Sequence, residues 1–91
     1  MQDYIDKHIK SQMRVGNCYF MKNDRIQNYI DKYITGQLAV GDCYYMKNEN
    51  DEDVIVVVLN NCLRSITKQN NDWLRINEYY QDGTTTETYE R

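Results

Sequence analysis

Two stretches in the first half of the chain carry an amphipathic helical pattern. Apolar and aromatic side chains recur at positions i, i+1, i+4 and i+5 from Tyr4, and the same spacing begins again at Tyr29. This spacing places the side chains on one face of a helix with 3.6 residues per turn. The polar residues between them fall on the opposite face. The pattern therefore predicts two short helices, each with one apolar face to bury.

The second helix has residues at both ends that suit helix termini. Asp24, followed three residues later by Gln27, fits a capping box. Gly36 can adopt the left-handed conformation that commonly ends a helix. We therefore predict a helix over residues 25–35.

After each helical pattern the period of the apolar residues changes to two. A Val-Gly turn followed by a short aromatic segment predicts strands at 17–22 and 42–47. The run VIVVVL at 54–59 is continuously apolar and rich in β-branched residues. Such a run is typical of a central strand buried on both faces.

The rest of the chain predicts further strands and a single domain. CLRSITKQ indicates a weaker strand, and Asp82-Gly83 is a hairpin signal between a strand at 73–80 and TTTETYER. These strands are enough for a small SH3-like barrel. We predict an α+β fold: a tandem helix-strand repeat followed by an antiparallel small β-barrel (SH3-like) or curled sheet. The single domain spans 1–91, with 38–91 as its β-rich part.

Residues 2–24 and 27–49 are tandem copies of one helix-strand unit. They align without a gap, with 14 of 23 positions identical at an offset of 25. Identity at polar positions indicates duplication, because a shared hydrophobic pattern alone would not preserve it. The first strand runs into a helix, so 17–22 has no sequential antiparallel neighbour and is predicted to be an edge strand. Such an edge predicts a homodimer formed through residues 17–22.

Composition limits both the partners and the compartment. Fourteen acidic and 11 basic residues give a net charge of −3, which disfavours a nucleic-acid partner unless the basic side chains cluster. No segment has the apolar length of a membrane span, and the pattern of a secretion signal is missing. Three cysteines without a CxxC pair fit a reducing compartment. We therefore expect a cytoplasmic protein without a membrane contact.

The residue types that usually carry catalysis or bind metals are not arranged for either. His8 is the only histidine, and the same place in the second copy holds a tyrosine, which favours packing over proton transfer. Cys62 lacks the flanking glycine turn or nearby base of a thiol nucleophile. For Cys18 and Cys43, buried packing is favoured over a disulfide or metal site. We expect no catalytic residue, metal or cofactor, and a solvated hairpin loop at 48–53 rather than a calcium site.

The surplus of aromatic side chains favours a partner-binding face. The chain holds nine tyrosines and one tryptophan, more than a core of this size needs. Alternation puts Trp73, Arg75 and Tyr79 on one face of their strand and its aliphatic side chains on the other. Trp, Arg and Tyr are enriched at binding hot spots. We predict that these three form an exposed partner-binding patch, with Tyr44 as a further contact; the competing interpretation is that Trp73 packs within the molecule.

These features favour a small non-enzymatic protein-interaction module. A short, proline-free chain rich in residues with A/T-rich codons is also typical of a phage-type accessory protein that binds and inhibits a host protein. The alternative is a small β-barrel that binds single-stranded nucleic acid, because such barrels present Tyr and Trp to stack on bases. On the predicted strands only Arg64, Lys68 and Arg75 are available to neutralise phosphates, which makes nucleic acid the less favoured partner.

Overall fold

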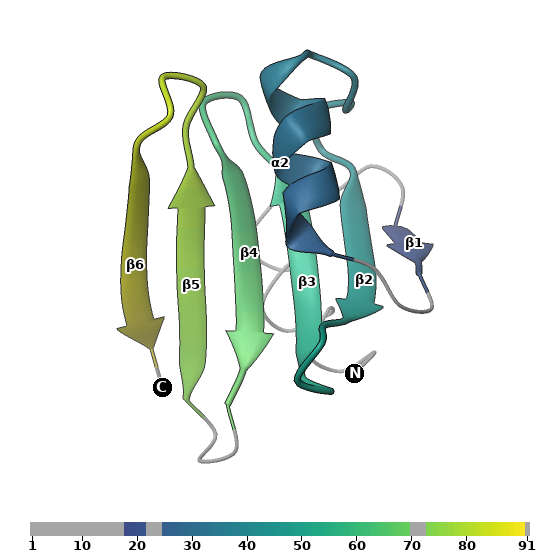
Figure 1. The fold of residues 1–91 in the computed structure, drawn as a ribbon, viewed down its shortest axis with the longest axis vertical. Helices are drawn as coiled ribbons and strands as arrows, with labels where there is room; N and C mark the ends of the chain where they lie inside the picture. Colours follow the sequence, from purple (N-terminus) through teal and green to yellow (C-terminus); the bar gives the residue numbers. More distant parts are fainter. Residues whose placement is uncertain (1–17, 22–24, 70–72, 91) are drawn as a thin grey trace.

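The computed structural model describes residues 18–21, 25–69 and 73–90. They form one six-stranded mixed sheet in the order β1-β2-β3-β4-β5-β6, with the helix α2 against one face (Figure 1). The elements are β1 (Cys18–Phe20), α2 (Ile26–Ile34), β2 (Cys43–Lys47), β3 (Asp53–Val58), β4 (Leu63–Lys68), β5 (Leu74–Tyr79) and β6 (Thr85–Glu90). The α+β class is confirmed, whereas the predicted first helix, with His8, lies outside the described residues. In the described part of the chain no helix is long and apolar enough to cross a membrane.

The sheet combines one parallel pair with an antiparallel meander. β2 to β6 follow one another as antiparallel neighbours, while β1 pairs with β2 in parallel. α2 lies in the crossover that a parallel pair requires, so β1, α2 and β2 form a βαβ unit. Equivalent residues of the two repeat copies, such as Cys18 and Cys43, lie opposite each other in the β1-β2 register. β1 is therefore an edge strand of the sheet, as predicted.

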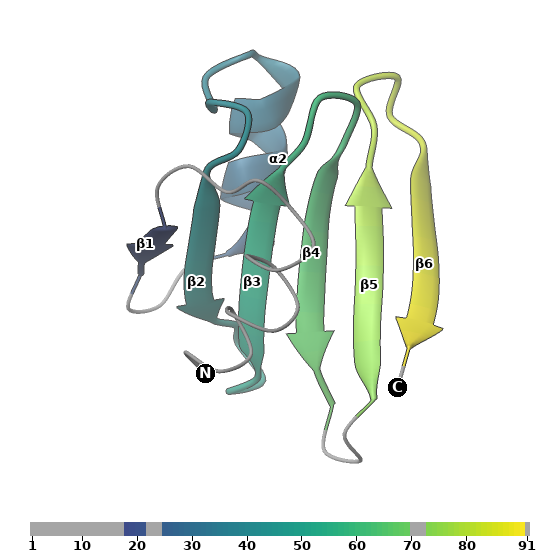
Figure 2. The ribbon, with the colours of Figure 1, turned by 180° about the vertical axis from the view of Figure 1, so that it is seen from behind.

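The sheet does not close into the predicted SH3-like barrel. β1 and β6 are its two opposite edges, as both views show (Figures 1 and 2). Barrel closure needs strands that are tilted and progressively shifted in register. A row of partners can be followed across β2 to β6, through Cys43, Val57, Arg64, Glu78 and Thr86, and it ends at β6. No pairing joins β6 to β1 among the described strands, so the sheet stays open. The barrel alternative of the prediction is wrong, and the curled sheet is the alternative that agrees with the structure.

β3 is the centre of the hydrophobic core. Its residues 54–58 are all buried, which confirms the prediction of a strand covered on both faces. Alternate side chains of β3 join two clusters, one on each side of the sheet. The cluster beneath α2 contains Tyr29, Tyr33, Met46, Val54, Val56, Val58 and Leu63. The cluster on the opposite face contains Cys43, Ile55, Val57, Ile66 and Leu74.

The ends of α2 agree only in part with the sequence signals. The N-cap residue is Arg25, whose side chain makes no capping hydrogen bond. The Gln27 amide donates to a carboxylate one turn further on. The predicted capping box involves Asp24, which lies outside the described residues. Gly36 has a φ of 72°, and its N–H donates to a helix carbonyl. The predicted helix over 25–35 and its left-handed stop are confirmed.

Tyr33 places a hydroxyl group in the core without a hydrogen-bond partner among the described residues. Leaving a buried hydroxyl unsatisfied costs about 1–3 kcal/mol. Tyr33→Phe keeps the ring and removes this group, so we expect the free energy of unfolding to rise by about 1 kcal/mol in urea denaturation. The matched control is Tyr45→Phe, because the Tyr45 hydroxyl donates to Asp53 at 2.8 Å and its loss should lower the same free energy. Equal effects of the two substitutions would contradict this account.

Candidate functional site

The patch predicted on β5 lies on the same face of the sheet as α2. Leu74 is buried on the opposite face, which confirms the predicted alternation. Trp73, Arg75 and Tyr79 are half-buried, which lies between the predicted exposed patch and the competing interpretation of packing within the molecule. One reason is the neighbouring helix, because Tyr79 packs against the apolar cluster beneath α2. β5 therefore presents a partly covered polar and aromatic surface beside the helix.

Tyr44 belongs to a different surface, an aromatic cluster that joins β1, β2 and α2. Its ring stacks on Tyr19, with centroids 5.2 Å apart, and is tilted against Tyr29 at 4.9 Å. Burial, followed by the charges of Asp42 and Tyr19, raises the pKa of Tyr44. Two strands, β3 and β4, separate Tyr44 from β5. The four predicted contact residues therefore lie on two separate surfaces.

A small recess opens on the α2 face, where the helix begins beside β4 and β5. Its volume is about 120 Å³. The recess is lined by apolar Ile26, Met46 and Val54, by polar Asn48, Ser65, Thr67, Arg75 and Asn77, and by Tyr79. Two of the predicted contact residues thus meet in one hollow. Sequence reasoning missed the hydroxyl and amide side chains that surround them.

Among the described residues, Arg75 is the only charged one that lines this recess. Its Nε atom is buried without a hydrogen-bond partner in the described part of the chain. Its Nη2 atom lies 3.8 Å from a carboxylate oxygen of Glu52, beyond hydrogen-bond distance. A buried donor left in this way costs about 1–3 kcal/mol. The recess is therefore bordered by a guanidinium that keeps one orphaned donor and is ion-paired with Glu52.

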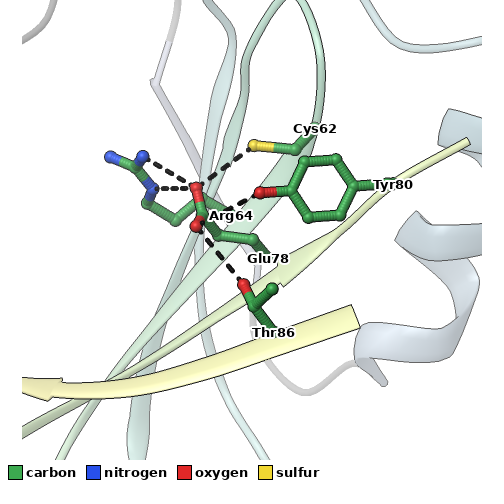
Figure 3. A network of polar contacts seen from close by, with 5 residues as sticks. All are labelled: Cys62, Arg64, Glu78, Tyr80 and Thr86. Carbon is green, nitrogen blue, oxygen red and sulfur yellow. Dashed lines mark hydrogen bonds and ion pairs between the residues drawn. The ribbon is translucent and has the colours of Figure 1, made fainter. Parts of the chain in front are cut away.

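On the opposite face of the sheet, Glu78 is the centre of a polar network (Figure 3). Its Oε2 accepts hydrogen bonds from Arg64 Nη2 at 2.8 Å, Arg64 Nε at 3.2 Å and the Cys62 thiol at 3.5 Å. Its Oε1 accepts from the hydroxyls of Tyr80 and Thr86, both at 3.4 Å. The hydrogen bonds from Arg64 hold the pKa of Glu78 below its ordinary value. The network ties β4, β5 and β6 together.

The same network makes Cys62 a poor nucleophile. Burial, followed by the hydrogen bond to Glu78, raises the pKa of the Cys62 thiol to about 11. The thiol is therefore protonated at neutral pH. Because the thiolate is the reactive form of cysteine, Cys62 acts here as a packed hydrogen-bond donor.

The network also predicts how stability responds to acid. A carboxylate with a lowered pKa in the folded state stabilises the protein above its unfolded pKa, about 4.3, and this contribution is lost as the pH falls through the folded pKa. We expect Glu78→Gln to lower the free energy of unfolding by about 1–2 kcal/mol at neutral pH and to flatten its decrease in acid. Urea denaturation across the acidic range measures both effects. Glu87→Gln, on the exposed strand β6, is the comparison variant with the same change of charge. An unchanged slope in Glu78→Gln would refute the prediction.

The acidic loop at 48–53 is a hydrogen-bonded turn between β2 and β3. The side-chain oxygen of Asn48 accepts from the backbone N–H groups of Asn50 and Glu52, each at 2.9 Å. Asp51 takes the left-handed conformation, with a φ of 60°. The predicted hairpin loop is thus confirmed. Among the residues that the structure describes, no group of three or more His, Cys, Asp or Glu side chains could hold a metal ion.

β6 is the second edge of the sheet, and all six of its residues are exposed. The N–H of Tyr80 donates to the carbonyl of Thr84 at 2.9 Å, which sets the phase of the β5-β6 ladder. Hydrogen-bonded and non-bonded pairs alternate along an antiparallel ladder. Thr86, Thr88 and Glu90 therefore direct their backbone groups toward β5.

The remaining residues of β6 direct their backbone groups away from the sheet. We call Thr85, Glu87 and Tyr89 the open edge, because each offers an outward N–H and C=O on an exposed strand. The side chains of Glu87 and Tyr89 are linked by a hydrogen bond of 2.6 Å. Thr85 begins the strand directly after the turn at Gly83, whose φ is 89°. The open edge thus has regular strand geometry and unused hydrogen-bonding groups.

Comparison with known proteins gives no match. No protein family, no curated protein and no solved structure corresponds to the chain. Any proposal about function must therefore come from the structure itself, and the two features that suggest binding are the recess and the open edge.

The basic side chains of the strands do not gather in one groove. Arg64 and Lys68 alternate with Leu63, Ser65 and Thr67 along β4, so they project from the face opposite α2. Arg75 projects from the α2 face, where it lines the recess. The three side chains that were predicted to neutralise phosphates thus lie on both faces of the sheet.

Proposed function

We propose that this chain is a small non-enzymatic protein-interaction module that takes an extended segment of a partner protein as an added strand beside β6. The open edge carries the proposal, because Thr85, Glu87 and Tyr89 hold outward N–H and C=O groups on an exposed strand. An incoming strand would satisfy these groups and continue the sheet. Main-chain hydrogen bonds supply affinity in this mode of recognition, and the alternate side chains supply specificity.

β6 has few of the features that prevent an edge strand from pairing with a strand of another chain. Native edges are commonly shortened, bulged, covered or supplied with lysine and proline. β6 spans six residues, keeps an unbroken register with β5 and contains neither lysine nor proline. Threonine and tyrosine, which favour strands, fill four of its six positions. This composition and regularity support a pairing role.

The negative charge of β6 indicates which side chains we expect on the added strand. Glu87 and Glu90 are its charged residues, and Asp82 adds a further carboxylate in the adjoining turn. Opposite charges across neighbouring strands are favourable, and like charges are destabilising. We therefore expect lysine or arginine at alternate positions of the added strand. A second copy of β6 would instead bring one acidic strand against another.

Inhibition of a host protein is one consequence of such binding, because a segment held as an added strand is withdrawn from its own interactions. A phage-type accessory role in the cytoplasm is part of this proposal. The free thiol of Cys62 is in line with a reducing compartment.

A homodimer through residues 17–22 is a separate proposal. It is supported by the position of β1 at the sheet edge and by the exposed side chains of Tyr19, Phe20 and Met21. Sedimentation at increasing protein concentration tests it. A monomer at every concentration would exclude the dimer and leave the β6 proposal untouched.

Binding of single-stranded nucleic acid is the less favoured function. It requires a continuous basic track beside stacking aromatic side chains. Arg64 is engaged by Glu78, and Arg75 lies on the other face of the sheet. Binding to oligonucleotides that weakens steeply with salt would favour this alternative over the open edge.

Selection of short linear peptides on the immobilised protein tests the proposed function. We expect the enriched peptides to alternate basic with strand-favouring residues. Their binding should slow the hydrogen exchange of the amides of Thr85, Glu87 and Tyr89, which the free edge leaves open to solvent. Replacing the basic residues by glutamate should weaken binding about tenfold or more. A selection without enriched peptides, or peptides that protect other amides, would exclude strand addition at β6.

A further inference from the structure

A second binding site lies in the recess where α2 begins, and two of its lining residues, Arg75 and Asn77, pair across β5 and β6 with Tyr89 and Glu87 of the open edge. Ser65 and Thr67 line the recess as well, and each is only 3% exposed. Arg75, which also lines the recess, has a buried Nε without a hydrogen-bond partner among the described residues. Buried polar groups are almost always hydrogen-bonded in native proteins. An orphaned donor beside two hydroxyls in one hollow indicates a place for a ligand.

Arg75 brings a positive charge to the recess although the chain as a whole is acidic. It supplies the only charge among the lining residues that the structure describes. The nearest partner, Glu52, is itself held by the amides of Asn48 at 2.9 Å and Gln69 at 3.4 Å. The first turn of α2, which begins at the lining residue Ile26, contains no acidic side chain. The positive end of the helix dipole therefore reinforces the guanidinium, and both favour an anion.

The recess walls suit a small carboxylate. A guanidinium can pair with both oxygens of a carboxylate, and Arg75 supplies the one positive charge that a monoanion needs. The two hydroxyls and the Asn77 amide are further donors for the same oxygens. Met46 and Val54 form an apolar wall that can accept a short alkyl stem. The volume of about 120 Å³ leaves room for only a few atoms beyond the carboxylate.

We propose that this recess binds a short-chain carboxylate, with the oxygens on Arg75, Ser65, Thr67 and Asn77 and the stem against Val54. The same chemistry is presented by a free short-chain acid and by the glutamate side chain of a protein. Separate titrations with propionate and with blocked glutamate distinguish these two sources.

Titration of the isotope-labelled protein with sodium propionate, followed by amide NMR at constant ionic strength, tests the site. We expect saturable shifts at Ser65, Thr67, Arg75 and the Asn77 side chain. Propionamide, which has the same shape without the charge, should cause no saturable shift. Blocked glutamate, compared with blocked glutamine, tests the side-chain source in the same way. Saturation by propionate alone assigns a free acid, and saturation by both assigns the shared carboxylate chemistry.

Variants separate this site from a general effect of charge. Arg75→Gln should weaken propionate binding roughly tenfold to a hundredfold. Lys68→Gln removes the same charge from an exposed position on the other face of β4 and should leave binding unchanged. Ser65→Val fills the recess without changing charge and should abolish binding while the sheet stays folded.

Three results would overturn the assignment. Equal binding of propionate and propionamide would exclude recognition of the charge. Wild-type affinity in the folded Ser65→Val variant would place the ligand elsewhere. Saturable binding of inorganic phosphate without binding of either carboxylate would show that the recess takes a different anion.

Discussion

Replacement of Tyr29 by alanine is expected to lower the free energy of unfolding by about 3–5 kcal/mol. Tyr29 is 2% exposed and is the point where α2 meets both the core and the aromatic cluster. Its ring lies 4.9 Å from that of Tyr44, and the ammonium group of Lys32 lies 5.6 Å from its centroid. The substitution removes these contacts and leaves a cavity beneath the helix. The loss is a large fraction of the stability of a domain of this size.

Ile34→Ala is the matched control for Tyr29→Ala. Ile34 lies on the same helix, but its side chain is 49% exposed. Its truncation should cost less than about 1 kcal/mol. Urea denaturation followed by the fluorescence of Trp73 measures both variants. Similar losses at the two positions would show that α2 is not held to the sheet through Tyr29.

Two proline substitutions should distinguish the residues of β6 whose N–H groups bond to β5 from those whose N–H groups point outward. Thr88 directs its N–H to Ile76 on β5, so Thr88→Pro removes a ladder hydrogen bond from the middle of the strand. We expect this variant to lose roughly 1–3 kcal/mol of unfolding free energy. Glu87 directs its N–H outward, where proline is tolerated on an edge strand. Glu87→Pro should therefore cost less than about 1 kcal/mol.

The proline pair is measured by urea denaturation and by the hydrogen exchange of the β5 amides. Exchange at Ile76 should accelerate in Thr88→Pro and stay at the wild-type rate in Glu87→Pro. Equal destabilisation by the two prolines, or a larger loss at Glu87, would mean that the ladder has the opposite phase. The outward groups would then belong to the other residues of β6.

Local signals in the sequence were sufficient for most individual elements. The apolar run from Val54, the stop at Gly36 and the turn at Gly83 each act through near neighbours, and each agrees with the structure. The barrel was wrong because closure depends on the register between strands. Period-2 alternation does not determine that register. That the sheet ends at β6 without pairing to β1 emerges only when all the strands are aligned.

The candidate binding surfaces could be predicted less well from the sequence. Alternation correctly grouped Arg75 with Tyr79, but it could not show that Tyr79 would pack against the apolar cluster beneath α2. The recess also needs Ser65 and Thr67 from the neighbouring strand. Polar residues at alternate positions of β4 and β5 were a usable signal, because strand pairing places them on one face. The open edge has no local signal, since it follows from the order of the strands.

The most direct test of the central claim is the binding of one selected basic peptide to wild-type protein, Glu87→Gln and Glu87→Pro at the same ionic strength. Glu87→Gln keeps the outward N–H and loses only the charge, so its affinity should fall modestly. Glu87→Pro loses the N–H as well, and its affinity should fall at least about tenfold below that of Glu87→Gln. Its fold should remain intact by circular dichroism. Equal affinities of the folded Glu87→Pro and Glu87→Gln variants would contradict strand addition at β6.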